Sequence, residues 1–261
     1  MSLDPIRIST LAGFTAGQDW RLSLAHDRPE DTLFWITRGQ GRLLLNGTRR
    51  GYGTHNAIYI PAGTLFSLEM GRQVIGMALS VPVGSGARLP TGPRQLRLRD
   101  TGVIAELNGL IEAVDREARA ARPLVQDTLD AYLGLISVWL RRQITLPEHL
   151  PVRQSAAAKL SARACARIAA HYASPMTISE HAAALDVTPT HLARACKTAT
   201  GHTAADLLTQ RVLHAARSAL VETDAPMNEI ARHLGFGSAA YFTRFIQSRT
   251  GATPTALRSA G

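Results

Sequence analysis

Cysteine is scarce in this chain of 261 residues, which contains only two, Cys165 and Cys196. They do not form a Cys-x-x-Cys pair, so neither a structural zinc site nor a disulfide framework is expected, in keeping with a reducing cytoplasm. Cys196 falls on an apolar position of a helical pattern, and we expect a small core residue there rather than a redox switch.

Signals for export or membrane insertion are also missing from the sequence. The first ten residues, MSLDPIRIST, lack the basic and then apolar segments of a signal peptide, and no apolar run is long enough to span a membrane. We therefore expect a cytoplasmic protein without a membrane partner.

Motifs of the common catalytic sites are a third absence. The sequence has no Gly-rich phosphate loop, no Gly-x-Ser-x-Gly elbow and no His-Glu-x-x-His pair, and its nine histidines are scattered. We expect neither an enzyme nor a bound cofactor.

Positive charge is present and unevenly distributed. Of the formal net charge of +9, residues 151–261 carry +6, from 12 Lys and Arg against 6 Asp and Glu. Such an excess suits a module that binds a polyanion, although a solvated surface has the same composition.

The last hundred residues contain one pattern twice, at 178–201 (ISEHAAALDVTPTHLARACKTATG) and at 228–251 (NEIARHLGFGSAAYFTRFIQSRTG). Equivalent residues of the two copies lie 49 positions apart before a central turn and 50 positions apart after it. The second copy therefore has one additional residue in the turn, where an insertion is easily accommodated. The identical pairs include Glu180 and Glu229, Leu185 and Leu234, Arg194 and Arg244, and Gly201 and Gly251.

Local signals in the first repeat predict two helices joined by a tight turn. Thr177 and Glu180 have the spacing of a capping box, which starts the first helix. Thr188 followed by Pro189 is an N-cap with proline at the first helical position, so the second helix begins there. Gly201 suits a left-handed cap at its end.

The second repeat has equivalent capping residues, with Ser238 as the N-cap of its second helix and Gly251 as the glycine that ends it. Between the repeats, apolar residues at helical spacing predict one long helix over 204–222. At ~1.5 Å per residue it spans close to 30 Å, and successive major grooves on one face of DNA are about 34 Å apart. Five side chains of the two second helices are expected to face the core: Leu192, Ala195, Tyr241, Phe242 and Phe245.

Residues 160–258 resemble the DNA-binding domain of AraC/XylS-type transcription regulators. The most distinctive stretch is LGFGSAAYFTRFIQSRTGATP in the second repeat. The resemblance implies that the second helix of each repeat is a recognition helix for double-stranded promoter DNA. RNA polymerase is an implied partner if the protein activates transcription.

Carried over by position, the resemblance assigns two groups of DNA-contacting residues. Arg194 is expected to pair with a guanine edge, and Arg244 either contacts DNA or forms an ion pair inside the domain. The first helix supplies Thr188, Thr190, His191, Ala193, Arg194 and the phosphate contact Lys197, although His191 is equally expected to be a surface histidine without a role. The second supplies Ser238, Ala239, Ala240, Thr243, Arg244 and the phosphate contacts Gln247 and Arg249.

The first hundred residues have a different pattern. Short apolar runs such as LFWIT, RLLLNG and AIYIPAG alternate with Gly-bearing turns and predict a small barrel or sandwich over 1–99. Residues 100–144 predict two amphipathic helices, interrupted at Arg122-Pro123, that either pack on the barrel or form a dimer seam. Residues 145–159 contain two prolines and an alanine run and are predicted to be a linker to the domain at 160–261.

The barrel segment is similar to the cupin-type barrel that often precedes this DNA-binding domain. The four positions that hold metal ligands in cupins are occupied here by His26, Arg28, Thr32 and Phe66, so no metal is expected. With Phe34 or Trp35 nearby, His26, Arg28 and Phe66 either form an effector pocket in which Arg28 favours a carboxylate, or simply fill the barrel.

These patterns predict an α+β protein: a cupin-like barrel with a helical dimerisation segment, followed by an all-α domain of two helix-turn-helix units joined by a long helix. We expect a homodimeric, sequence-specific transcription regulator controlled by a small-molecule effector in the barrel. A constitutive binder whose barrel only dimerises is the alternative. A methyl-accepting repair regulator would need a cysteine cluster in the N-terminal half, and no cysteine precedes Cys165.

Overall fold

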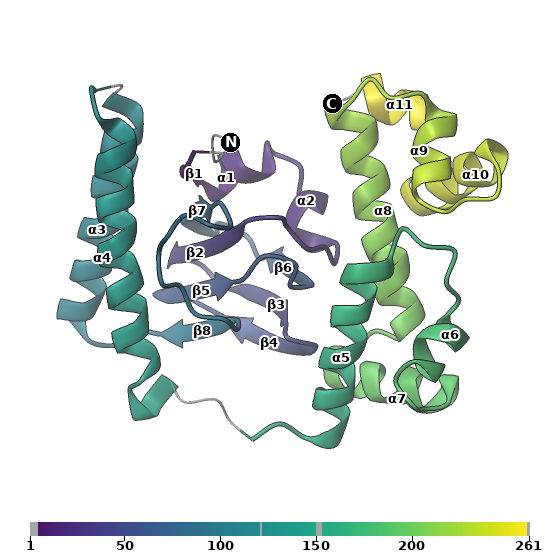
Figure 1. Ribbon diagram of the computed structural model, residues 1–261, viewed down its shortest axis with the longest axis horizontal. Coiled ribbons are helices and arrows are strands. Elements are labelled where there is room, and N and C mark those ends of the chain that lie inside the picture. The colour runs from purple at the N-terminus through teal and green to yellow at the C-terminus, as the bar shows by residue number, and fades with distance from the viewer. Residues whose placement is uncertain (1–4, 121, 150–152, 260–261) are drawn as a thin grey trace.

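The computed structural model describes residues 5–120, 122–149 and 153–259 and has a β-rich N-terminal part and a helical C-terminal part (Figure 1). The fold class expected from the sequence is confirmed. Eight strands pair antiparallel in two sheets, of order β1-β7-β2-β5-β8 and β4-β3-β6. The strands are β1 (Arg7–Thr10), β2 (Asp31–Arg38), β3 (Gly41–Leu45), β4 (Thr48–Tyr52), β5 (Asn56–Ile60), β6 (Phe66–Met70), β7 (Ile75–Val81) and β8 (Arg94–Arg97).

The two sheets enclose one core, and the larger sheet supports a second core on its outer face. Because side chains alternate along a strand, Phe34 and Ile36 of β2 enter the core between the sheets, while Leu33 and Trp35 face outward. Both faces are buried, which explains why β2 is an almost continuous apolar run. Short helices α1 (Leu11–Thr15) and α2 (Trp20–Ser23) lie between β1 and β2 in the chain.

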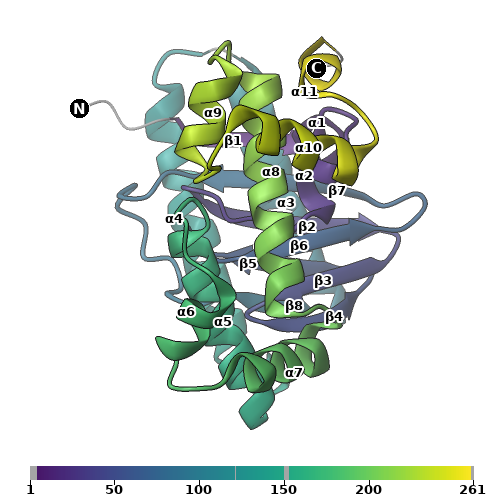
Figure 2. The same ribbon diagram turned by 90° about the vertical axis from the view of Figure 1, so that its right-hand side faces the viewer.

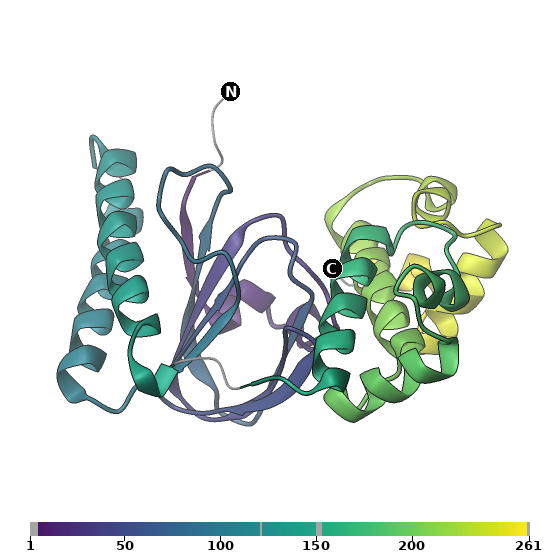
Figure 3. The same cartoon turned by 60° about the horizontal axis from the view of Figure 1, so that its bottom comes forward.

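Helices α3 (Thr101–Ala120) and α4 (Val125–Ile144) cover the outer face of the larger sheet (Figure 3). The apolar residues at helical spacing that predicted them, such as Leu107 and Trp139, are buried against each other and against Trp35. The predicted packing of the helix pair on the barrel is therefore confirmed for this face. The interruption at Arg122-Pro123 lies between the two helices, as expected.

The C-terminal part consists of seven helices in the described residues, and α8 runs through its centre (Figure 2). The helices are α5 (Ala156–His171), α6 (Ile178–Ala183), α7 (Pro189–Thr200), α8 (Ala204–Glu222), α9 (Met227–His233), α10 (Ala239–Thr250) and α11 (Pro254–Ser259). Each of the two helix-turn-helix units has its own apolar core. The two predicted units and the long helix between them are present.

Local signals set the helix ends as expected. Thr177 and Glu180 form a capping box, and the hydroxyls of Thr188 and Ser238 accept hydrogen bonds from the first turns of α7 and α10. Gly201 ends α7 with a left-handed backbone at φ 82°, and an equivalent glycine ends α10.

Two expectations are wrong in detail. The core position expected for Tyr241 is not observed, because its side chain is 55% exposed and only covers the half-buried Phe236, with ring centroids 5.6 Å apart. The predicted linker at 145–159 includes a 3-10 turn at Pro147–His149 and the start of α5, because Ser155 caps that helix and the alanine run forms its first turn.

The barrel and the C-terminal helices share an apolar cluster. It joins barrel residues to residues of α5 and α8: Ala25, Leu44, Leu65, Cys165, Ile168, Ala169 and Leu207. All are buried, so the two parts pack on each other rather than being joined by the linker alone. None of the helices in the described residues is long and apolar enough to cross a membrane.

Candidate DNA-binding surface and interdomain pocket

Helices α7 and α10 present their predicted contact residues to solvent near the two ends of α8 (Figure 2). The exposed residues are Thr188, Thr190, His191, Arg194, Lys197, Ser238, Ala239, Ala240, Arg244, Gln247 and Arg249; Ala193 and Thr243 are half-buried. The opposite faces carry Leu192 and Phe242, both fully buried. Each helix is therefore held by one face and exposes the other.

The basic side chains of this surface are not engaged elsewhere. Within the residues that the structure describes, Arg194, Lys197, Arg244 and Arg249 form no ion pair. Of the alternatives for Arg244, an ion pair inside the domain is thus not observed. Guanidinium groups without a carboxylate partner are available to phosphates and base edges.

The interior of the barrel is filled with side chains. Phe34 and Phe66 are fully buried, and their ring centroids lie 5.9 Å apart in the core between the sheets. Trp35 lies on the other side of the sheet, where its Nε1 donates a hydrogen bond to Asn108 Oδ1 at 2.7 Å. Of the two alternatives for these residues, filling of the barrel describes Phe34 and Phe66, and His26 packs on Phe66 with ring centroids 4.3 Å apart. Trp35 is not grouped with them.

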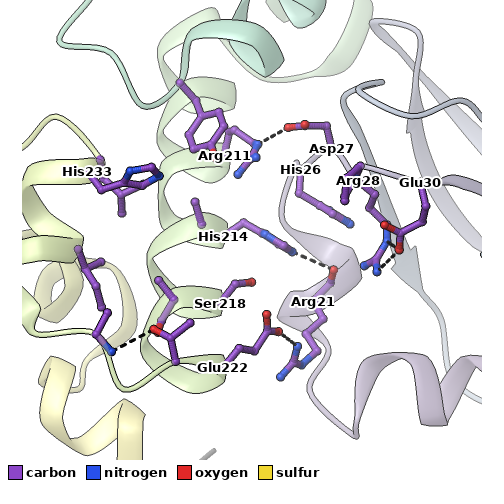
Figure 4. Close-up of a pocket in the computed structure, with 18 of the residues that line it drawn as sticks. Arg21, His26, Asp27, Arg28, Glu30, Arg211, His214, Ser218, Glu222 and His233 are labelled. Carbon is purple, nitrogen blue, oxygen red and sulfur yellow. Dashed lines mark hydrogen bonds and ion pairs between the residues drawn. The ribbon is translucent and has the colours of Figure 1, made fainter. Parts of the chain in front are cut away.

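Two of the five residues considered for an effector pocket, His26 and Arg28, line a cavity between the barrel and the C-terminal helices (Figure 4). Its volume is about 870 Å³. Apolar and aromatic walls come from Phe14, Tyr172, Ala215, Ile230 and Leu234. The cavity thus has contributions from the barrel, from α8 and from the second helix-turn-helix unit.

Ion pairs across this cavity connect the two parts of the chain. Arg211 of α8 pairs with Asp27 of the barrel, and Arg21 of α2 pairs with Glu222 at the end of α8 (Figure 4). A third pair, within the barrel, joins Arg28 to Glu30 at 2.6 Å. The side chain of Arg211 is 8% exposed, so its pair with Asp27 is largely shielded from water.

Comparisons with known proteins agree with the helical pattern. Residues 181–260 match the sequence model of a family described as a helix-turn-helix domain. The C-terminal domain is of the AraC/XylS type. The protein is accordingly a DNA-binding transcription regulator. A comparison with curated protein sequences finds no match.

Solved structures similar to this chain cover either its C-terminal helices or its whole length. The C-terminal domain of AraT, a response regulator from Geobacillus stearothermophilus, is 26% identical, covers 42% of this chain and 89% of its own, and has a TM-score of 0.38. A DNA-binding transcriptional dual regulator from Escherichia coli is 22% identical over 42% of this chain and 96% of its own, at a TM-score of 0.35. Wild-type ToxT from Vibrio cholerae, with an unsaturated fatty acid bound, is 12% identical over 99% of this chain and 96% of its own, at 0.45.

Two stacked imidazoles form part of the wall of the interdomain cavity in this regulator. The rings of His26 and His214 are parallel within 4°, with centroids 4.1 Å apart. His26 Nδ1 lies 2.9 Å from the carbonyl oxygen of Leu24, and His214 Nε2 lies 3.1 Å from that of Arg21. Each ring therefore donates one proton to a backbone carbonyl, which leaves the other nitrogen as an acceptor.

Burial keeps both imidazoles neutral. It lowers the pKa of His26 well below its usual value, and the nearby His214, Arg28 and Arg211 lower it further. Burial likewise lowers the pKa of His214 to about 3, against a raising effect of the hydrogen bond to Arg21, and the guanidinium groups around it add to the lowering. A proton on either ring would be a buried charge among arginines.

Arg211 and His214 were not among the residues predicted from the sequence, although a signal for Arg211 was present. Arg211 occurs four residues after the buried Leu207 of α8, so helical spacing puts it on the same face as the apolar cluster. A charged residue at a core position of an amphipathic helix indicates a buried ion pair. Its partner, Asp27, is 184 residues away in the chain and has no such marker.

Proposed function

We propose that the protein binds two adjacent major-groove sites of promoter DNA in a sequence-specific manner, with one recognition helix in each. The observation that carries this proposal is the pair of capped helices, α7 and α10, with exposed polar faces near opposite ends of α8. α8 has 19 residues and is therefore ~28 Å long, close to the ~34 Å between successive major grooves.

Within this proposal the residues of the two helices have different roles. In α7, Arg194 pairs with a guanine edge, and Thr190 and Ala193 lie beside it on the base-facing side. Lys197 and Arg249 contact phosphates and fix the position of the protein without selecting a sequence. The second helix presents methyl groups where a base-reading helix often has polar side chains, so we assign to it mostly phosphate contacts and shape recognition. The remaining proposed contacts are Thr188, His191, Ser238, Ala239, Ala240, Thr243, Arg244 and Gln247.

Arg194→Ala is expected to cost ~1–3 kcal/mol of specific binding and to relax the preference at one base position, because a bidentate contact to guanine is lost. Arg249→Ala is the matched control. It removes a charge from the same surface and is expected to weaken binding to all sequences alike. The slope of log K against the logarithm of the salt concentration is expected to decrease in magnitude by about one. Fluorescence anisotropy with specific and random duplexes at several salt concentrations measures both the loss of binding free energy and the salt dependence of binding. Equal losses on both duplexes for Arg194→Ala contradict the assignment of α7 as the base-reading helix.

Selection of DNA fragments from a genomic library by the full-length protein tests the two-groove proposal directly. The expected result is a motif of two boxes whose centres lie about one helical turn apart. Recovery of salt-sensitive fragments without a common motif contradicts it.

We further propose that a small-molecule effector bearing a carboxylate binds in the interdomain cavity and controls DNA binding. The cavity has apolar walls and a few charged groups that converge on it, as ligand sites do. Arg28 donates from Nε and Nη2 to Glu30, and its Nη1, which has no hydrogen-bond partner among the described residues, is the donor that favours a carboxylate. An effector acts only if it binds one arrangement of the domains more tightly than another, and a site built from both domains meets that condition.

A panel of aliphatic and aromatic carboxylic acids in a thermal-unfolding assay tests this site. At least one acid is expected to raise the midpoint by several degrees, through mass action on the folded state. Ala215→Trp, which fills the cavity, is expected to abolish the shift, and Arg28→Gln to weaken the apparent affinity at least tenfold. A shift that survives Ala215→Trp contradicts the location.

The homodimer remains a proposal, together with an RNA polymerase contact if the protein is an activator. The face of α3 and α4 that was a candidate seam is buried on the sheet. A dimer would therefore use the outer face, where Leu135 of α4 is 55% exposed. We propose residues 1–99, 100–144 and 160–261 as the barrel, the dimerisation segment and the DNA-binding domain.

A further inference from the structure

A second cavity, of about 780 Å³, lies where one edge of the barrel meets the start of α5. β4 and β8 form its barrel side, and the 3-10 turn at Pro147–His149 and the first turn of α5 form the other side. No residue of α6, α7, α9 or α10 lines it. The cavity is therefore distinct from the surface proposed to bind DNA.

Arginine dominates the lining of this cavity. Five arginines come from three segments of the chain: Arg50, Arg94, Arg97, Arg99 and Arg153. The only carboxylate in the lining is that of Glu148, which lies 3.4 Å from His149 Nε2. Five guanidinium groups thus converge on a space with one carboxylate, and this carboxylate lies beside an imidazole.

The arginines are not neutralised by ion pairs within the described part of the chain. Arg94 donates a hydrogen bond to the carbonyl oxygen of Pro93 at 3.0 Å, and Arg97 donates one to that of Gly51 at 3.2 Å. Partial burial and then the nearby Arg97 lower the pKa of Arg50. Like charges gathered at one place are unfavourable alone and favourable around an anion.

The N-terminus of α5 adds to the positive potential. Ser155 caps this helix of 16 residues, its hydroxyl accepting a hydrogen bond from Ala158 N, and both residues line the cavity. The helix therefore directs its positive end, with the free N–H groups of its first turn, at the same space as the arginines. Backbone N–H groups and guanidinium forks together are the donors that bind phosphate groups.

We propose that this cavity binds a small phosphorylated molecule with two or more phosphate groups. Five arginines exceed what one phosphate needs, because one guanidinium already makes a bidentate contact with it. The concave shape, bounded by strands on one side and a helix end on the other, suits a compact anion rather than a DNA backbone. Successive side chains of β4 point to opposite faces, so Arg50 lies away from Arg49, the neighbour that contacts Glu69. A ligand held here would connect the barrel to α5, the first helix of the DNA-binding domain.

Isothermal titration of the full-length protein with sodium tripolyphosphate, at constant ionic strength, tests the proposal. The expected result is one site, with orthophosphate at least a hundredfold weaker than tripolyphosphate. Arg50→Gln combined with Arg97→Gln is expected to weaken tripolyphosphate binding at least tenfold. The matched control is Arg38→Gln combined with Arg72→Gln, which removes the same charge from exposed barrel positions outside the cavity and is expected to change binding less than twofold.

Two results would overturn the proposal. Equal losses for the two double variants would mean that tripolyphosphate responds to net charge alone. A loss of random-duplex affinity by Arg50→Gln/Arg97→Gln as large as its loss of tripolyphosphate affinity would identify the arginines as part of the DNA-binding surface. Both double variants replace exposed arginines by the shorter, neutral and polar glutamine, so they shorten two side chains equally and remove the same charge. Circular dichroism at 25 °C verifies that both are folded.

Discussion

Acidification from pH 7 to pH 5 is expected to lower the free energy of unfolding by about 2 kcal/mol through His214 alone. In the unfolded chain its imidazole takes up a proton as the pH falls below about 6.5, whereas in the folded protein burial keeps the pKa near 3 and the ring neutral. The unfolded state therefore binds more protons, and stability present above pH 6.5 is lost as the pH falls toward 3. His26, whose pKa is lowered in the same direction, adds to the loss.

The groups around the two imidazoles also determine which part of the structure opens first on acidification. Arg28, Arg211 and Arg21 are the cations that lower the pKa of His214, and Asp27 is already paired with Arg211. Protonation of either ring would thus place an uncompensated charge between the barrel and α8, and the interdomain contact is expected to open before either domain unfolds.

His214→Phe keeps an aromatic ring on His26 but removes the titrating group. Urea unfolding followed by circular dichroism at pH 7, 6 and 5 is expected to show a smaller loss of stability for this variant than for the wild type. His191→Ala is the control, because it removes an exposed imidazole of α7 that is not part of the interdomain contact. For this variant the dependence of the unfolding free energy on pH is expected to equal that of the wild type. If the unfolding free energy of His214→Phe fell with pH as steeply as that of the wild type, the role given to the stacked pair would be contradicted.

The sequence predicted most where the determinants of structure are local. The starts of α6, α7 and α10 follow from their N-cap residues, and the ends of α7 and α10 follow from the glycine after each helix. The two helix-turn-helix units could therefore be placed before any packing was known. Strand β4 was missed, because its residues Thr48–Tyr52 (TRRGY) have no apolar alternation and pair through the backbone with β3. Tyr241 was misplaced because its aromatic side chain suggested the core, while α10 uses Phe242 and Ile246 for that purpose.

The candidate effector site could be predicted only in part. The sequence indicated His26 and Arg28, but it did not settle which alternate face of β2 points into the barrel, since both faces are buried. The cavity that contains His26 and Arg28 is completed by residues of α8, nearly two hundred positions later. Contacts of such separation leave no periodic trace in the sequence.

The contact between the barrel and α5 depends on one glycine, and replacing it is expected to loosen the domain interface. Asn46 and Gly47 both have positive φ, 50° and 65°, and form the tight turn between β3 and β4. A Cβ atom at Gly47 would lie 2.3 Å from the backbone nitrogen of Ala162 in α5. Backbone atoms cannot yield as a flexible side chain does, so the turn and the helix must separate.

Gly47→Ala is therefore expected to combine a left-handed strain of ~1–2 kcal/mol with an overpacking cost of ~1–3 kcal/mol. Gly63→Ala is the matched control: its φ is 69° and no neighbouring atom lies within 4 Å of the place that its new methyl group would take, so only the strain applies. Differential scanning calorimetry is expected to show a larger loss of stability for Gly47→Ala than for Gly63→Ala. Small-angle scattering is expected to show a larger radius of gyration for Gly47→Ala alone, because the shared cluster around Leu207 opens. Equal effects of the two substitutions would mean that the barrel and α5 are not held in contact in solution.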